Sequence, residues 1–197
     1  MPFYHSLNTL PHMQPTLLPK KELKYLKART HGGMKLKKRR KVARPLIPGA
    51  VTHLVLASSK AKGEFSFYRH KKVVDSLLRE RARLYLIEIV DFVNMGNHLH
   101  IKVRFKDAIR FKNFLRTFCG LLPRKLTHAH RGTRFGRFWD GLAYTRVLLT
   151  KLEELGLRIY FEGNRRERDT GPIAREKHLR HWNQFLYRLR KTRAAPA

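Results

Sequence analysis

The stretch that most constrains the fold is the segment 97–105, in which polar and apolar residues alternate strictly from His98 onward. Alternation with a period of two is the pattern of a β-strand that buries one face. The odd positions from Leu99 to Phe105 are apolar and would face a core, whereas the even positions from His98 to Arg104 are polar. The segment therefore predicts a strand of a sheet that presents two histidines and two cations on one face.

The residues around this strand predict further strands and helices. Apolar runs of strand length alternate with stretches of helical spacing, and Asp107 is expected to cap one helix. This order favours an α+β fold, a mainly antiparallel sheet with the helices on one face. Strands are expected at Val51–Ala57, Leu84–Val93 (as a central strand), His98–Phe105 and Tyr144–Val147, helices at Tyr68–Arg81, Asp107–Leu121, Thr150–Gly163 and His178–Arg190, and a basic loop at Pro123–Arg137.

Both ends of the chain are basic and are expected to extend from a single domain. The first 48 residues are rich in proline and hold a basic run at 35–41, which suits an arm that orders on nucleic acid. We expect an irregular extension at 1–48, a domain at 49–165 and a basic, partly helical extension at 166–197. The arm's predicted nucleic-acid contacts are Lys37, Lys38, Arg39 and Arg40.

The charge of the chain limits the classes of molecule that it is expected to bind. There are 44 Lys and Arg against 14 Asp and Glu, a formal net charge of +30, yet 42% of the residues are hydrophobic and can build a core. Such an excess favours a polyanion partner. A membrane is not expected as a partner, because the charge is spread along the chain and no apolar segment approaches the roughly 20 residues of a span. The single cysteine, Cys119, excludes an intrachain disulfide framework and fits a reducing cytosol.

The polar face of the predicted strand has the residue types of a metal and phosphate site. Two imidazoles two residues apart on a strand, His98 and His100, can bind one divalent cation, although a third ligand is still needed. Lys102 and Arg104 follow on the same face and could hold a phosphate backbone. A lone His-x-His is common on exposed strands, so this motif gains its weight from its neighbours.

Three motifs resemble the HUH single-tyrosine transposases, particularly the REP-associated tyrosine transposases. Met95–His100, Met-Gly-Asn-His-Leu-His, is similar to the Met-Pro-Asn-His-x-His segment of that family. Gly136–Asp140 is similar to its Gly-x-Leu-Trp-Gln segment. Arg158–Asn164, Arg-Ile-Tyr-Phe-Glu-Gly-Asn, resembles its Tyr-Ile-x-x-Asn-Pro segment. The resemblance extends over residues 50–164.

The resemblance implies a fold of the ferredoxin-like HUH endonuclease type and a set of site residues. Tyr160 would be the nucleophile, and His98, His100 and Asn164 would bind Mg²⁺ or Mn²⁺, with zinc left open. Tyr160 and Asn164 lie four residues apart and would share one face of a helix. The implied activity is cleavage and rejoining of single-stranded DNA near a hairpin through a 5′-phosphotyrosine intermediate. The implied setting is the bacterial cytoplasm, at the nucleoid, as a monomer or homodimer.

The sequence also departs from the family. Asn164 is followed by Arg165 rather than proline, Gly96 replaces a proline, and Asp140 stands where glutamine is common. The alternative is therefore a domesticated, non-catalytic nucleic-acid-binding protein on the same fold. An RNA-binding, ribosome-associated protein would explain the charge but not the four site residues.

Other residues compete for roles in the site. Tyr144 is a rival nucleophile that could instead pack beside Trp139, and His53 could adjoin the site or serve the core. His128 and His130 form a second His-x-His in a basic stretch, which favours phosphate contact or a solvated loop over a metal site. The same stretch supplies three predicted nucleic-acid contacts, Arg131, Arg134 and Arg137.

Overall fold

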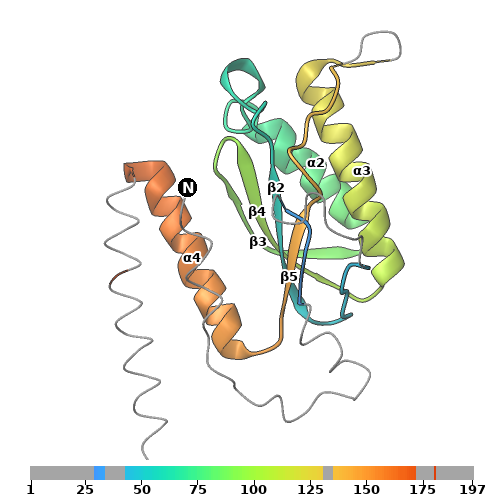
Figure 1. Cartoon of the computed structure of the whole chain (residues 1–197), viewed down its shortest axis with the longest axis vertical. Coiled ribbons are helices and arrows are strands. Elements are labelled where there is room, and N and C mark those ends of the chain that lie inside the picture. Colours follow the sequence, from blue (N-terminus) through green and yellow to red (C-terminus); the bar gives the residue numbers. More distant parts are fainter. Residues whose placement is uncertain (1–28, 34–42, 131–134, 172–179, 181–197) are drawn as a thin grey trace, which may run out of the picture.

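The computed structural model describes residues 29–33, 43–130, 135–171 and 180. They form a five-stranded sheet of order β1-β5-β2-β4-β3 with every neighbouring pair antiparallel, together with three long helices (Figure 1). The predicted α+β class is confirmed. The strands are β1 (Thr30–His31), β2 (Val51–Ala57), β3 (Ile87–Asn94), β4 (His98–Phe105) and β5 (Tyr144–Leu148).

The alternating strand β4 lies inside the sheet, between β2 and β3. Its odd residues are buried in the main core, and Leu99, Ile101 and Val103 are fully buried. His100 lies opposite Val55 of β2 and Val93 of β3 in the register of the sheet. The alternation therefore gives one apolar face and one histidine face, as predicted.

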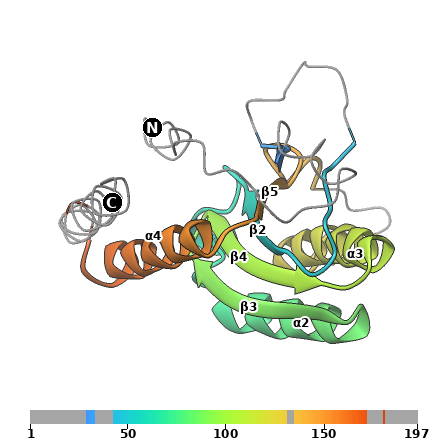
Figure 2. The ribbon, with the colours of Figure 1, turned by 90° about the horizontal axis from the view of Figure 1, so that it is seen from below.

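Two helices cover the apolar face of the sheet. These are α2 (Lys71–Leu84) and α3 (Ala108–Thr127), which pack on it and on each other (Figure 2). The predicted cap of α3 is confirmed, because the Asp107 carboxylate accepts hydrogen bonds from the backbone N–H groups of Ile109 and Arg110. A row of buried phenylalanines, Phe111, Phe114 and Phe118, fixes which side of α3 faces the sheet.

Helix α3 continues through Pro123, where the sequence predicted a loop. A proline has no N–H, so the carbonyl oxygen of Cys119 loses its helical donor at this position. The indole Nε1 of Trp139 donates to that oxygen instead, at 2.8 Å. Beyond the proline, Leu126 is buried in the core and secures the last turn. The predicted loop is therefore wrong for Pro123–Thr127.

The third long helix, α4 (Lys151–Thr170), lies on the other face of the sheet from α2 and α3 (Figure 2). The helices were expected on one face, and α4 departs from that arrangement. Its Leu157 and Phe161 pack on Val51 and Val93 in a second, smaller cluster. Apolar cover on both faces also explains why β3 is rich in apolar residues although it is an edge strand rather than the predicted central one.

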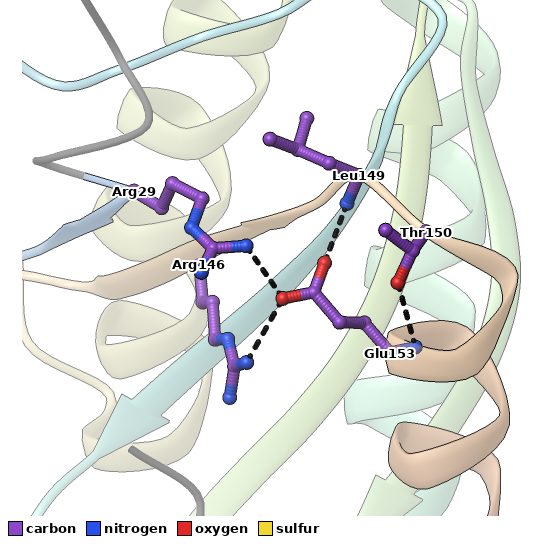
Figure 3. A network of polar contacts seen from close by, with 5 residues as sticks. All are labelled: Arg29, Arg146, Leu149, Thr150 and Glu153. Atoms are coloured by element: carbon purple, nitrogen blue, oxygen red, sulfur yellow. Dashed lines mark hydrogen bonds and ion pairs between the residues drawn. The ribbon is translucent and has the colours of Figure 1, made fainter. Parts of the chain in front are cut away.

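The start of α4 is held by a buried carboxylate (Figure 3). The hydroxyl of Thr150 accepts a hydrogen bond from the N–H of Glu153, which caps the helix. The Glu153 side chain, 8% exposed, accepts from the N–H of Leu149 and from the guanidinium groups of Arg29 and Arg146. These contacts join α4 to β5 and to the residue that precedes β1.

The predicted domain boundaries stay predictions. Two observations bear on the ends of the domain: Thr30–His31 pairs with β5, and α4 runs past residue 165 to Thr170. The basic run 35–41 and all but one residue of the predicted helix 178–190 lie outside the described residues. No helix in the described part of the chain is long and apolar enough to cross a membrane.

Candidate active site between the histidine face and α4

The two histidines of the motif lie on the face of β4 that α4 covers. The rings of His98 and His100 are 4.8 Å apart between centroids and nearly perpendicular, at 85°. His98 is half-buried at the start of the strand, with Nδ1 2.6 Å from the side-chain oxygen of Asn97. His100 is fully buried. The strand thus supplies one accessible and one enclosed imidazole.

Helix α4 brings Tyr160 to this pair. The centroid of its ring lies 5.3 Å from that of His100, with the two planes at 82°. Tyr160 is half-buried at the margin of the small cluster that attaches α4 to the sheet. Tyr160 and His100 are 60 positions apart in the chain, yet their rings meet. The sequence analysis predicted that a tyrosine and two histidines would come together in this way.

His53 of β2 completes the group of rings. Its Nε2 lies 3.1 Å from Nδ1 of His100, and its ring also contacts those of Tyr160, Tyr144 and Phe161. Burial, followed by the nearby positive charge of Arg146, lowers the pKa of His53 to about 3. The imidazole is therefore neutral near pH 7, with one ring nitrogen that donates and one that accepts.

The sequence does not decide whether His53 adjoins the site or serves the core. The signal that could have settled it is the antiparallel register of β2 and β4. His53 lies opposite Lys102, so it shares the face of the even-numbered residues of β4. That register depends on long-range pairing, which the local alternation of either strand does not contain.

Asn164, the third predicted ligand, lies one helical turn after Tyr160 and is 1% exposed. Its Nδ2 is buried without a hydrogen-bond partner in the described part of the chain. Amide nitrogen and oxygen exchange places when the group is turned over, so this orphaned end could present its oxygen to a ligand. The buried amide thus fits a role beyond core packing.

The donor set for a metal ion is limited. No group of three or more His, Cys, Asp or Glu side chains within residues 29–33, 43–130, 135–171 and 180 is arranged to hold one. Two imidazole nitrogens and an amide oxygen remain, and they suit a divalent cation that completes its shell with water or phosphate oxygens. His98, His100 and Asn164 thus have the donor types that a divalent cation accepts, and their role as its ligands stays a prediction.

Tyr144, the rival tyrosine, lies on β5 at the other side of His53. The two rings are 6.2 Å apart and meet edge to face. Burial raises the pKa of the Tyr144 hydroxyl, whereas the charge of Arg146 opposes that rise. The residue is thus held in its neutral form against the group of rings, which is also what a packing role requires.

The two cations predicted to follow phosphates along β4 both face carboxylates. Lys102 Nζ lies 3.7 Å from Glu154 of α4, and Arg104 lies 3.0 Å from Glu88 of β3. Each charge is therefore partly balanced within the protein. Their predicted contact with nucleic acid stays a prediction.

Of the seven other predicted nucleic-acid contacts, Arg137 is the one that belongs to the described residues. Arg137 donates to the carbonyl oxygens of Trp139 and Asp140, so its guanidinium holds the turn that leads into β5. Arg131, Arg134, Lys37, Lys38, Arg39 and Arg40 lie outside the described residues.

Comparisons with known proteins find likeness in fold alone. No protein-family model matches the sequence, and no curated protein does. The structure is similar to that of a REP-associated tyrosine transposase bound to a REP hairpin, with a TM-score of 0.50 and 10% identity over 67% of this chain and 75% of that one. A putative transposase from Deinococcus radiodurans is also similar, with a TM-score of 0.40 and 16% identity over 64% of this chain and 98% of that one.

Proposed function

We propose that this chain is a transposase-like enzyme that cleaves and rejoins single-stranded DNA next to a hairpin. The observation that carries the proposal is the position of Tyr160, whose ring lies 5.3 Å from that of His100 although the two residues come from different elements. The similarity of the fold to a transposase bound to a hairpin is in accord with it. Such an enzyme would act on the nucleoid in the bacterial cytoplasm.

The proposed chemistry is a transesterification at phosphorus. The Tyr160 oxygen attacks the phosphate and loses its proton, a phosphotyrosine bond forms, and the bond to the 3′ oxygen breaks. The 3′ oxygen leaves with a proton, and the 5′ end of the other fragment stays on the enzyme. Attack by a different 3′-OH reverses the step and joins new strands. One P–O ester bond replaces another, so no nucleotide hydrolysis is needed.

His98, His100 and Asn164 would hold the divalent cation, Mg²⁺ or Mn²⁺. When bound, the cation would polarise a non-bridging phosphate oxygen and stabilise the negative charge of the transition state. For this role His100 has to keep a proton on Nδ1 so that Nε2 is available as a ligand. His53 can accept that N–H, because its neutral ring has one unprotonated nitrogen.

The test is a covalent-adduct assay with Tyr160→Phe and Tyr144→Phe. Single-stranded hairpin oligonucleotides labelled at the 3′ end are incubated with protein and Mn²⁺, and adducts are separated on denaturing gels. We expect an adduct with wild type and Tyr144→Phe and none with Tyr160→Phe, which still binds the DNA. Chelation of the metal should abolish the adduct. An adduct formed by Tyr160→Phe would show that the nucleophile is another residue.

The alternative is a nucleic-acid-binding protein that has lost the chemistry. The burial of the site favours it, because His100 is fully buried and Asn164 is 1% exposed. With α4 in this position neither side chain is open to solvent, and so neither is open to a phosphate. Failure of the wild-type protein to form an adduct with any member of a hairpin library would favour this alternative.

A further inference from the structure

The solvent-facing side of α3 carries five cations, and the only carboxylate in or next to the helix in the sequence is that of Asp107, which caps it and interacts with Arg110. The sequence has no Asp or Glu between Asp107 and Asp140. No cation of α3 takes part in an ion pair within the described part of the chain. The exposed cations of the helix, here called the α3 basic face, are Arg110, Lys112, Arg116, Arg124 and Lys125.

The other long elements balance more of their charge with carboxylates, although α2 keeps Lys71, Lys72 and Arg83 exposed and outside the ion pairs of the described residues. On α2, Arg79 pairs with Asp75. On the histidine face, Lys102 pairs with Glu154, as Arg104 does with Glu88. Most carboxylates of the described residues thus lie on the sheet, α2 and α4, and Asp107 is the one at the start of α3. The largest set of cations outside ion pairs on one of the three long helices therefore lies on α3, away from the proposed active site.

Helix stability does not explain this arrangement. A helix dipole favours acidic residues in the first turn, yet the first turn of α3 contains Arg110 and no acidic residue. Lys112 and Arg116 are four residues apart, a spacing at which like charges repel. The last turn is the one place where cations suit the dipole, and it accounts only for Arg124 and Lys125. A bound polyanion accounts for the whole set.

A hollow extends the α3 basic face past the end of the helix. Its volume is about 500 Å³, and Arg124, Lys125, His128 and His130 line it together with Leu121 and Ala129. His128 ends α3 in the left-handed conformation, with φ of 53°, and so turns the chain around this space. The second His-x-His of the sequence thus lies beside cations rather than in a metal site.

The residue types of the α3 basic face favour a duplex over a single strand as its ligand. Proteins that bind single strands combine cations with exposed aromatic rings on which bases stack. The aromatic residues of α3, Phe111, Phe114 and Phe118, are all buried. Cations alone suit the phosphates of a rigid duplex, and the 15 positions from 110 to 125 span about 22 Å of helix.

We propose that the α3 basic face binds the backbone of double-stranded DNA without regard to sequence. It lies on the opposite side of the sheet from α4 and Tyr160, so this duplex is a different segment from the strand at the active site (Figure 2). The choice of DNA over RNA rests on the proposed function. The location of the surface rests on the charges alone.

The test compares two double variants of the full chain that lose the same charge. Arg116→Gln/Arg124→Gln removes cations of the α3 basic face, and Lys72→Gln/Arg83→Gln removes exposed cations of α2. Binding to a short mixed-sequence DNA duplex is followed by fluorescence anisotropy between about 50 and about 200 mM salt. Each lost phosphate contact lowers the slope of log K against log salt by about 0.9, so the α3 variant should lose about 2 and the α2 variant almost nothing.

Three results would overturn the proposal. Equal losses in the two variants would mean that only net charge matters. A single strand whose binding depends on Arg116 and Arg124 as much as the duplex does would assign the surface to single-stranded DNA. Tighter binding of an RNA duplex would assign it to RNA. Tyr160→Phe should bind the duplex with the affinity and salt slope of wild type. A failure of the proposed chemistry would therefore show in the adduct assay and not in this binding assay.

Discussion

At the scale of single residues, the candidate site contains a buried imidazole, that of His53, which is neutral near pH 7. Nε2 of His53 lies 3.1 Å from His100, and burial keeps the pKa of His53 far below neutrality. A second charged ring at this place would repel a metal ion. A neutral ring can instead accept the N–H of His100 and fix its orientation.

We predict that His53→Leu weakens Mn²⁺ binding by about 10-fold to 100-fold, the usual effect of removing the hydrogen-bond partner of a ligating histidine. His53→Gln should retain most of the affinity, because its amide oxygen can accept the same hydrogen bond. Calorimetric titration with Mn²⁺ measures both variants. Thermal unfolding without metal serves as the control for fold. Equal affinity in wild type and His53→Leu would show that His53 only fills the core.

At the scale of elements, α3 shows how a distant side chain lets a helix pass a proline. Pro123 removes the donor for the carbonyl of Cys119, and the Trp139 indole restores a hydrogen bond at 2.8 Å. The two residues should therefore be energetically coupled. Neither can be assigned its full effect on stability without the other.

A double-mutant cycle tests this coupling. Trp139→Phe should lower the free energy of unfolding by more in the Pro123 protein than in Pro123→Ala, because the alanine supplies its own N–H to the Cys119 carbonyl. We expect a difference of about 1 kcal/mol, the cost of leaving a partly buried carbonyl without a donor. Denaturant unfolding measures all four proteins. Equal effects of Trp139→Phe in both backgrounds would contradict the proposed replacement of the helical hydrogen bond.

The same elements show what the sequence can and cannot predict. The alternation of 97–105 and the cap at Asp107 are local, and both are confirmed. The prediction of a loop after Pro123 was wrong, and the indole that bonds the free Cys119 carbonyl there belongs to Trp139, 16 positions further along the chain. The motifs indicated Tyr160 and the histidine pair, whereas the contact of His53 with His100 required the register of the sheet.

At the scale of the whole molecule, positive charge is in large excess and unevenly placed. The chain has 44 Lys and Arg against 14 Asp and Glu. Within the described residues, carboxylates pair with cations around α4 and β3, but not on α3. Repulsion between like charges opposes the compact state, so the native fold carries an electrostatic cost that a polyanion or dissolved salt relieves.

We predict that the midpoint of thermal unfolding rises when the salt concentration is raised from about 10 mM to about 150 mM, because the screening length falls from about 30 Å to about 8 Å. Screening also weakens exposed ion pairs such as Arg79 with Asp75, but pairs of this kind contribute little to stability. The net charge of +30 makes repulsion the larger effect. Calorimetric melting in a series of potassium chloride concentrations measures the shift.

The Arg116→Gln/Arg124→Gln protein should show a smaller rise than wild type, because its α3 carries fewer like charges that repel one another. A midpoint that falls with salt would mean that the ion pairs around the sheet outweigh the repulsion, and that the charge on α3 does not strain the fold.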